Sequence, residues 1–213
     1  MSTIAGMIDH TLLKADATSD DIRRICREAR ENGFASVCVN SSYAKMVTEE
    51  LAGSGVKTCC VVGFPLGAMS AYAKAYEAAC AVRDGADEID MVIHIGALKE
   101  GNDVYVEDDI RAVVEASRPA IVKVIIETCL LTEEEKVRAC RLSEKAGAAF
   151  VKTSTGFSTA GANVQDVALM RKTVGDRLQV KAAGGIHTPQ QAQDLIDAGA
   201  DRIGASNGMA LLQ

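Results

Sequence analysis

The feature of this sequence that most constrains its fold is a regular alternation of short, apolar, strand-like runs with amphipathic segments. Eight such runs recur roughly every 25–30 residues, a spacing typical of strands that alternate with helices. They are Ile8–Thr11, Ala35–Asn40, Lys57–Phe64, Glu88–His94, Ile121–Thr128, Phe150–Ser154, Leu178–Ala183 and Arg202–Ser206. Several are apolar apart from single polar residues, which is typical of parallel strands covered on both faces.

The segments between these runs carry the start and stop signals of helices. Thr132 with Glu135 and Thr188 with Gln191 have the spacing of capping boxes. Asn-Gly or Gly-Ala pairs end the helical patterns, as C-cap glycines do. The clearest helices are predicted at Asp20–Glu31, Ala71–Arg83, Glu133–Lys145 and Pro189–Ala198.

Eight strands alternating with helices fit either a closed barrel or an open, doubly wound sheet. No dinucleotide-binding glycine motif follows the first strand, and no P-loop occurs. The even spacing favours an α/β fold, a single (β/α)₈ TIM barrel over residues 1–213, with its reactive groups at the carboxyl ends of the strands. A chain of 213 residues is too short for two comfortable domains.

Composition narrows the partners and the compartment. The formal net charge of −6 argues against a nucleic-acid partner, and no apolar run is long enough to cross a membrane. Met1–His10 lacks the pattern of an export signal, so we expect a cytoplasmic protein. The seven cysteines have no zinc-type spacing and are interpreted as reduced core thiols.

Two lysines interrupt apolar strands near their ends. Lys152 and Lys181 each follow a valine, one strand–helix unit apart, so they can approach closely if both point into the barrel. Burial and a second ammonium group disfavour the charged form, and a neutral lysine can form a Schiff base with a carbonyl. Their position does not say which one reacts. The alternative is that both reach the barrel rim and merely pair with acids.

Acidic residues accompany these lysines in the predicted strands. Asp90 shares a strand face with Glu88, and it could neutralise a lysine or relay protons. Asp9, Lys123 and Glu127 are further polar residues in strand-like runs. A structural layer of ion pairs inside the barrel would use the same residue types, so for Lys123 and Glu127 a structural and a functional role both stay open.

Glycine-rich segments follow the last two predicted strands. Gly184, Gly185 and Gly204 offer bare backbone N–H groups, and Ser206 offers a hydroxyl, at the habitual phosphate position of this fold. Gly156 could let the backbone approach the same group, although tight turns alone would also use glycine. The three histidines lack metal-ligand spacing, so we predict hydrogen-bonded structural roles for them, no metal and no other cofactor.

These segments resemble the deoxyribose-phosphate aldolases over nearly the whole chain. The matching stretches are Ile8–Lys14, Val62–Gly67, Glu88–Ile93, Lys123–Thr128, Phe150–Phe157, Val180–Gly185 and Ile203–Ser206. The resemblance implies a reversible, metal-free cleavage of 2-deoxy-D-ribose 5-phosphate to acetaldehyde and D-glyceraldehyde 3-phosphate. The partners would then be a phosphorylated sugar and aldehydes, and a homo-oligomer is left open.

The resemblance also implies roles for individual residues. Lys152 would form the Schiff base, Lys181 would lower its pKa, and Asp90 with a water would move the proton at the acetaldehyde methyl carbon. The phosphate would be held by Gly156, Gly184, Gly185, Gly204 and Ser206, with Asp9 and Thr11 near the sugar. Two positions depart from the family pattern, His94 where asparagine is usual and Asn207 where serine is common.

Two other readings make different predictions. A sugar-phosphate isomerase or epimerase on the same fold would have acid–base residues and phosphate loops but no essential neutral lysine. A barrel kept only for binding or assembly should have lost site residues, whereas Lys152, Lys181 and Asp90 are all present.

Overall fold

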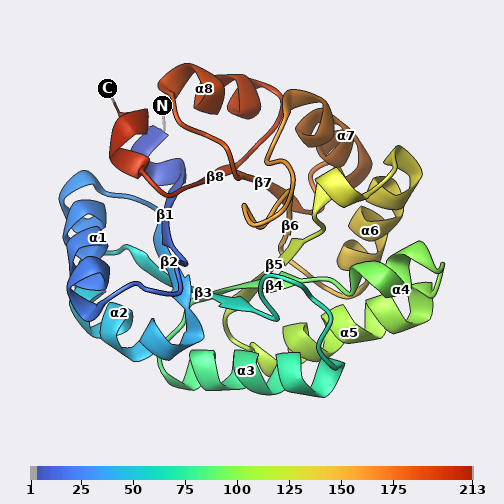
Figure 1. The fold of residues 1–213 in the computed structure, drawn as a ribbon, viewed down its shortest axis with the longest axis horizontal. Coiled ribbons are helices and arrows are strands. Elements are labelled where there is room, and N and C mark those ends of the chain that lie inside the picture. The colour runs from blue at the N-terminus through green and yellow to red at the C-terminus, as the bar shows by residue number, and fades with distance from the viewer. Residues whose placement is uncertain (1–3, 213) are drawn as a thin grey trace.

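A computed structural model describes residues 4–212 of the chain and shows eight parallel strands closed into a barrel. Each strand pairs with its neighbours in chain order, and β8 pairs with β1 (Figure 1). This confirms the predicted (β/α)₈ TIM barrel and excludes the open sheet. The strands are β1 Ile8–Leu12, β2 Ser36–Asn40, β3 Lys57–Val62, β4 Glu88–Val92, β5 Ile121–Ile125, β6 Phe150–Lys152, β7 Gln179–Ala183 and β8 Arg202–Ala205. The prediction of a single domain over 1–213 also includes residues 1–3 and 213, which lie outside the residues that the structure describes.

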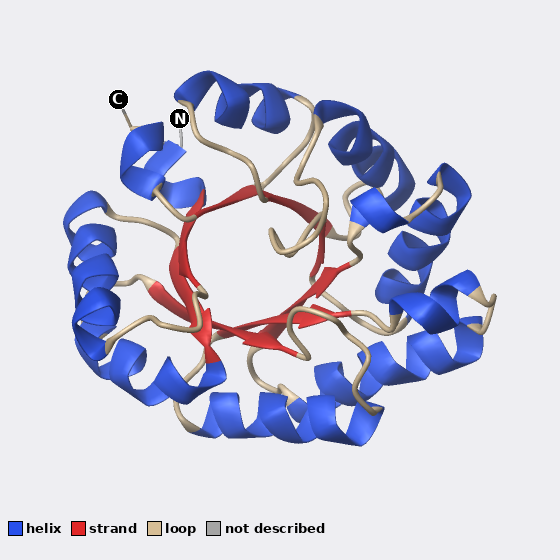
Figure 2. Cartoon of the chain, viewed as in Figure 1, coloured by secondary structure: helices blue, strands red, loops and turns tan. Residues whose placement is uncertain are grey.

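Helices form an outer ring around the strands (Figure 2). They are α1 Ser19–Asn32, α2 Ala44–Leu51, α3 Ala71–Arg83, α4 Ile95–Lys99, α5 Asp103–Ala116, α6 Glu133–Lys145, α7 Val164–Val174 and α8 Pro189–Asp197. Short 3₁₀ helices occupy Ile4–Met7, Ser41–Tyr43, Thr128–Leu130 and Gly208–Leu211. Within residues 4–212 no helix has both the length and the apolar character needed to span a membrane.

The local signals read from the sequence set the helix boundaries. Thr132 and Thr188 each accept a hydrogen bond from the backbone of the third helical residue, and both capping boxes are complete. At the end of α1, Gly33 adopts the left-handed conformation with φ 64°, which glycine tolerates without steric cost.

Several predicted strands extend past the observed strand ends, which are Val62, Val92, Ile125, Lys152 and Ala205, and the longest overrun is the one after Ile125. The apolar run Ile121–Thr128 is extended only as far as Ile125. Glu127 has φ 57° and ψ 66°, a left-handed conformation that cannot continue a strand, and a 3₁₀ helix starts at Thr128. The prediction that Glu127 lies in a strand is therefore wrong.

Strand alternation separates an apolar layer from a charged one. Ile89 and Met91 of β4 belong to the core packed beneath the helices, whereas Asp90 between them lies in the barrel interior. Val122 and Val124 flank Lys123 in the same way. The register pairs Asp90 with Lys123 across β4 and β5, and Lys152 with Lys181 across β6 and β7. The fold thus gathers charged side chains inside the barrel.

Candidate active site

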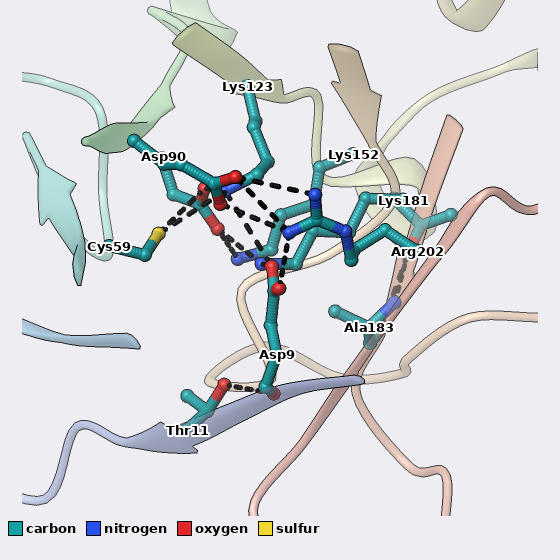
Figure 3. A network of polar contacts seen from close by, with 11 residues as sticks. Asp9, Thr11, Cys59, Asp90, Lys123, Lys152, Lys181, Ala183 and Arg202 are labelled. Atoms are coloured by element: carbon teal, nitrogen blue, oxygen red, sulfur yellow. Dashed lines mark hydrogen bonds and ion pairs between the residues drawn. The ribbon is translucent and has the colours of Figure 1, made fainter. Parts of the chain in front are cut away.

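The two strand lysines converge on one carboxylate inside the barrel. The Nζ atoms of Lys152 and Lys181 each lie 2.7 Å from Oδ2 of Asp90 (Figure 3). Lys181 also donates to Asp9. The side chains of Lys152 and Lys181 are 4% and 0% exposed, respectively, so neither extends to solvent at the barrel rim. The predicted close approach is confirmed, and the rim alternative is wrong.

A layer of buried charge surrounds this contact. Lys123 Nζ lies 2.8 Å from Oδ1 of Asp90 and 2.6 Å from Oε2 of Glu88. Arg202 Nη1 lies 2.7 Å from Oδ1 of Asp9 and 3.1 Å from Oε2 of Glu88. The four cations are Lys123, Lys152, Lys181 and Arg202, and the three carboxylates are Asp9, Glu88 and Asp90. The cluster therefore contains one more base than acid.

The ion-pair layer that the sequence left open for Lys123 and Glu127 exists for only one of them. Lys123 is in it, but Glu127 makes no ion pair among residues 4–212. Sequence reasoning missed Arg202, whose signal was a cation at the start of β8, in register with Lys181.

The electrostatics of the cluster follow from burial and proximity. Burial alone would raise the pKa of Asp90, but Lys123, Lys152 and Lys181 together hold it well below its usual range. The pKa of Asp9 is likewise lowered, because Lys181, Lys123 and Arg202 outweigh its burial. Burial lowers the pKa of Lys181, yet Asp9 and Asp90 overcome this and raise it above the ordinary lysine value. The two carboxylates favour the charged form of Lys181, which argues against the neutral state considered for either lysine.

Lys152 differs from Lys181 in its access to a cleft. Lys152 lines a cleft of about 420 Å³, whose walls come from the loops that follow β1, β6, β7 and β8. Lys181 does not line it, and its amine is enclosed by Asp9 and Asp90. Lys152 pairs with Asp90 alone. Of the two lysines, only Lys152 can be reached by a ligand in the cleft and has a single carboxylate partner.

The predicted phosphate residues surround the same cleft. Gly156, Gly184, Gly185, Gly204 and Ser206 all line it. A Cβ on Gly184 would lie 3.4 Å from Cα of Gly156 and 3.1 Å from Cα of Gly161, so the two glycine loops touch. Within residues 4–212, no protein acceptor takes a hydrogen bond from the backbone N–H of Gly156, Gly184 or Gly185. These donors remain available to an anion.

Of the two residues predicted near the sugar, only one reaches the cleft. Thr11 lines the cleft, whereas Asp9 is fully buried and its carboxylate oxygens accept hydrogen bonds from Lys181 and Arg202. The cleft also includes Lys14, which sequence reasoning did not select, and His187, for which it predicted only a structural role. Their signal was weak, since each is a single polar residue in a loop beyond a predicted strand.

Cys38, Cys59 and Asp90 form a cluster that the spacing of the cysteines did not reveal. Their possible ligand atoms lie within 4.8 Å of one another because β2 and β3 place the two cysteines side by side. Cys59 Sγ is 3.2 Å from Oδ1 of Asp90. Burial raises the pKa of the Cys59 thiol well above its usual range, and the oxygens of Asp90 already face three ammonium groups. Such surroundings disfavour another cation.

The positions that depart from the family pattern act in local capping. His94 Nδ1 accepts a hydrogen bond from the N–H of Ala97 at 3.1 Å and so caps the N-terminus of α4. Asn207 Oδ1 accepts from the N–H of Ala210 at 3.3 Å. His10 Nε2 lies 2.6 Å from Glu28, so His10 and His94 have the structural hydrogen bonds predicted for them.

Comparisons with known proteins show which family the chain belongs to. The sequence pattern of the DeoC/LacD family aldolases matches residues 3–213. A deoxyribose-phosphate aldolase of Geobacillus sp. is 59% identical over 213 residues, which cover 100% of this chain and 96% of that protein. One from Finegoldia magna is 61% identical over 206 residues, covering 97% of each.

Solved structures show the same fold. A deoxyribose-phosphate aldolase from Aeropyrum pernix superposes with a TM-score of 0.92 at 34% identity, covering 98% of this chain and 89% of that one. The aldolase QR15 gives 0.95 at 38% identity, covering 100% and 95%. The chain belongs to the DeoC/LacD family of aldolases.

Proposed function

We propose that this aldolase reversibly cleaves 2-deoxy-D-ribose 5-phosphate to acetaldehyde and D-glyceraldehyde 3-phosphate through a Schiff base on Lys152. The names of its relatives support the substrate. The observation that carries the choice of lysine is that Lys152 both contacts Asp90 and lines the cleft.

The cluster is suited to prepare Lys152 for attack. Attack on the substrate carbonyl requires the lone pair of Nζ, so an ammonium proton must leave first. Lys181 remains charged beside it and makes a second ammonium on the same Asp90 oxygen costly. Because four bases share three carboxylates, the base with cleft access can lose its proton without leaving a carboxylate unpaired.

The bond changes then follow from the iminium. Lys152 adds to the aldehyde carbon and water leaves, which gives a cationic iminium able to accept electrons. Loss of the hydroxyl proton from the third sugar carbon releases D-glyceraldehyde 3-phosphate, while the electrons of the broken C–C bond form an enamine. That hydroxyl proton passes through a water to Asp90, which then returns it through the water to the terminal carbon of the enamine, so Asp90 begins and ends the cycle ionised. Hydrolysis of the resulting iminium frees acetaldehyde and restores Lys152.

The cleft accounts for both ends of the substrate. The N–H groups around Gly156 and Gly184, with Ser206, would hold the phosphate. Thr11 would contact the sugar between the phosphate and Lys152. Asp9 would act through Lys181, whose charge it maintains, because its own oxygens do not line the cleft.

A product assay tests the proposal against the isomerase and epimerase alternative. Purified protein in the presence of a metal chelator should convert 2-deoxy-D-ribose 5-phosphate into equal amounts of acetaldehyde and D-glyceraldehyde 3-phosphate. A sugar-phosphate isomer formed without acetaldehyde would support the alternative. Activity that the chelator abolishes would refute the metal-free mechanism.

A further inference from the structure

Glu127 has a strained backbone that the chemistry above does not explain. Among residues 4–212 it is the only residue other than glycine with a positive φ. Glycine would adopt this conformation without steric cost, whereas a glutamate does so at a cost in free energy. The carboxylate must therefore do something at this position that glycine could not.

The contacts of the side chain show what it holds. Glu127 is 2% exposed, and Oε1 accepts from the backbone N–H of Thr155 at 3.1 Å. Oε2 accepts from the hydroxyl of Thr155, which in turn accepts from the N–H of Phe157 at 3.0 Å. A buried carboxylate without a cation is costly unless hydrogen bonds replace its water. Both oxygens of Glu127 are thus committed to the loop after β6.

This loop carries one half of the phosphate cradle. Gly156 lies between the two residues tied by these bonds, and it touches the loop after β7 at Gly184. Glu127 itself does not line the cleft, although Thr155 and Gly156 do. A change at Glu127 can therefore reach a ligand only through the placement of these two residues.

We propose that Glu127 is a positioning residue that fixes the Thr155–Phe157 loop so that the N–H of Gly156 faces the substrate phosphate. It thereby contributes to the preference for phosphorylated over unphosphorylated substrate. The inference rests on the proposed function, since it needs a phosphate in this cleft.

Paired substrates and three variants test the role. Glu127→Gly removes the carboxylate and relieves the backbone. It should lose about tenfold more in kcat/KM on 2-deoxy-D-ribose 5-phosphate than on 2-deoxy-D-ribose, mainly through KM, as expected for one lost phosphate hydrogen bond. Glu127→Gln keeps an acceptor for the loop and should retain the preference. Thr155→Val removes the hydroxyl from the same link and should shift the preference in the same direction, so the test does not depend on the folding of one variant.

Glu77 provides a matched control. Its carboxylate accepts from the N–H of Gly63 and the hydroxyl of Ser41, each at 2.9 Å, at the ends of other strands. Glu77→Ala removes the same kinds of bond and should leave the substrate preference unchanged. Equal losses on both substrates in Glu127→Gly, or no loss on either, would overturn the proposal.

Acetaldehyde trapping separates this inference from the proposed function. Acetaldehyde has no phosphate, so borohydride should trap it on Lys152 equally well in the wild type and in Glu127→Gly. An active wild type that traps nothing would refute the Schiff-base proposal itself. Normal trapping combined with an unchanged substrate preference would refute only the role of Glu127.

Discussion

Lys152 and Lys181 donate to the same oxygen of Asp90, each from 2.7 Å. Their surroundings are nevertheless unequal, because Asp9 also holds Lys181 while Lys152 faces the cleft. The pair is therefore suited to a division of roles, in which one amine stays charged and the other reacts. The register of β6 and β7 makes this contact possible by placing the two residues side by side.

Replacing the reactive amine should remove turnover while preserving the fold. Lys152→Leu should retain less than about 1% of wild-type kcat, because no covalent intermediate can form. Its circular dichroism spectrum should remain that of the wild type. Lys172→Leu, a change of an exposed lysine on α7, is the control and should keep full activity. Turnover of more than a few per cent in folded Lys152→Leu would remove Lys152 from the nucleophile's role.

A negative charge in the phosphate loop should weaken binding selectively. Ser206→Asp places a carboxylate where the phosphate is proposed to bind. Like-charge repulsion should raise KM for 2-deoxy-D-ribose 5-phosphate by about tenfold or more, with a smaller effect on 2-deoxy-D-ribose. Steady-state kinetics on both substrates provide the measurement. An unchanged KM for the phosphorylated sugar would place the phosphate elsewhere.

The buried charges predict how stability depends on pH. The pKa of Asp9 is lower in the folded protein than in the unfolded chain, where it is about 3.9. Its contribution to stability is therefore complete above the unfolded value and is lost as pH falls through the folded one. The pKa of Lys181 is raised, so its contribution is complete below about 10.4 and declines only at higher pH.

Urea unfolding at a series of acidic pH values checks this. The free energy of unfolding should fall as pH is lowered below about 5, and Asp9→Asn should fall less steeply. Asp20→Asn, at a largely exposed position on α1, is the control and should follow the wild type. A wild-type slope in Asp9→Asn would show that Asp9 does not contribute to the acid dependence.

A second buried ion pair lies outside the barrel interior and should matter for stability alone. Lys74 Nζ is 2.7 Å from Asp109 and 2.9 Å from the carbonyl of Val92. Burial lowers the pKa of Lys74 and raises that of Asp109, so each needs the other to remain charged. Lys74→Met should cost about 3–5 kcal/mol, because it leaves a buried carboxylate unpaired.

A double-mutant cycle tests this interpretation. Lys74→Met with Asp109→Leu should recover part of the lost free energy of unfolding, since no buried charge is then left alone. Losses that simply add would show that the two residues do not interact. The folded variants should retain normal kcat, because neither residue lines the cleft.

The sequence predicted best what short-range chemistry determines. The helix caps at Thr132 and Thr188 and the alternation around Asp90 depend on nearby residues, and all were found in the structure. Arg202 was missed because its partners, Asp9 and Glu88, meet it only when β8 closes the barrel. Glu127 was predicted in a strand because the apolar run continues past Ile125, the last strand residue. Glycine usually marks a left-handed backbone conformation in a sequence, and a glutamate in that conformation gives no such mark.

The most direct measurement is the site of covalent trapping by acetaldehyde and borohydride. Wild-type protein treated with both should carry an ethyl group on the peptide that contains Lys152, found by mass spectrometry, with activity lost in parallel. The peptide with Lys181 should remain unmodified. An adduct on Lys181 in place of Lys152, or no adduct on protein that cleaves the sugar phosphate, would contradict the account.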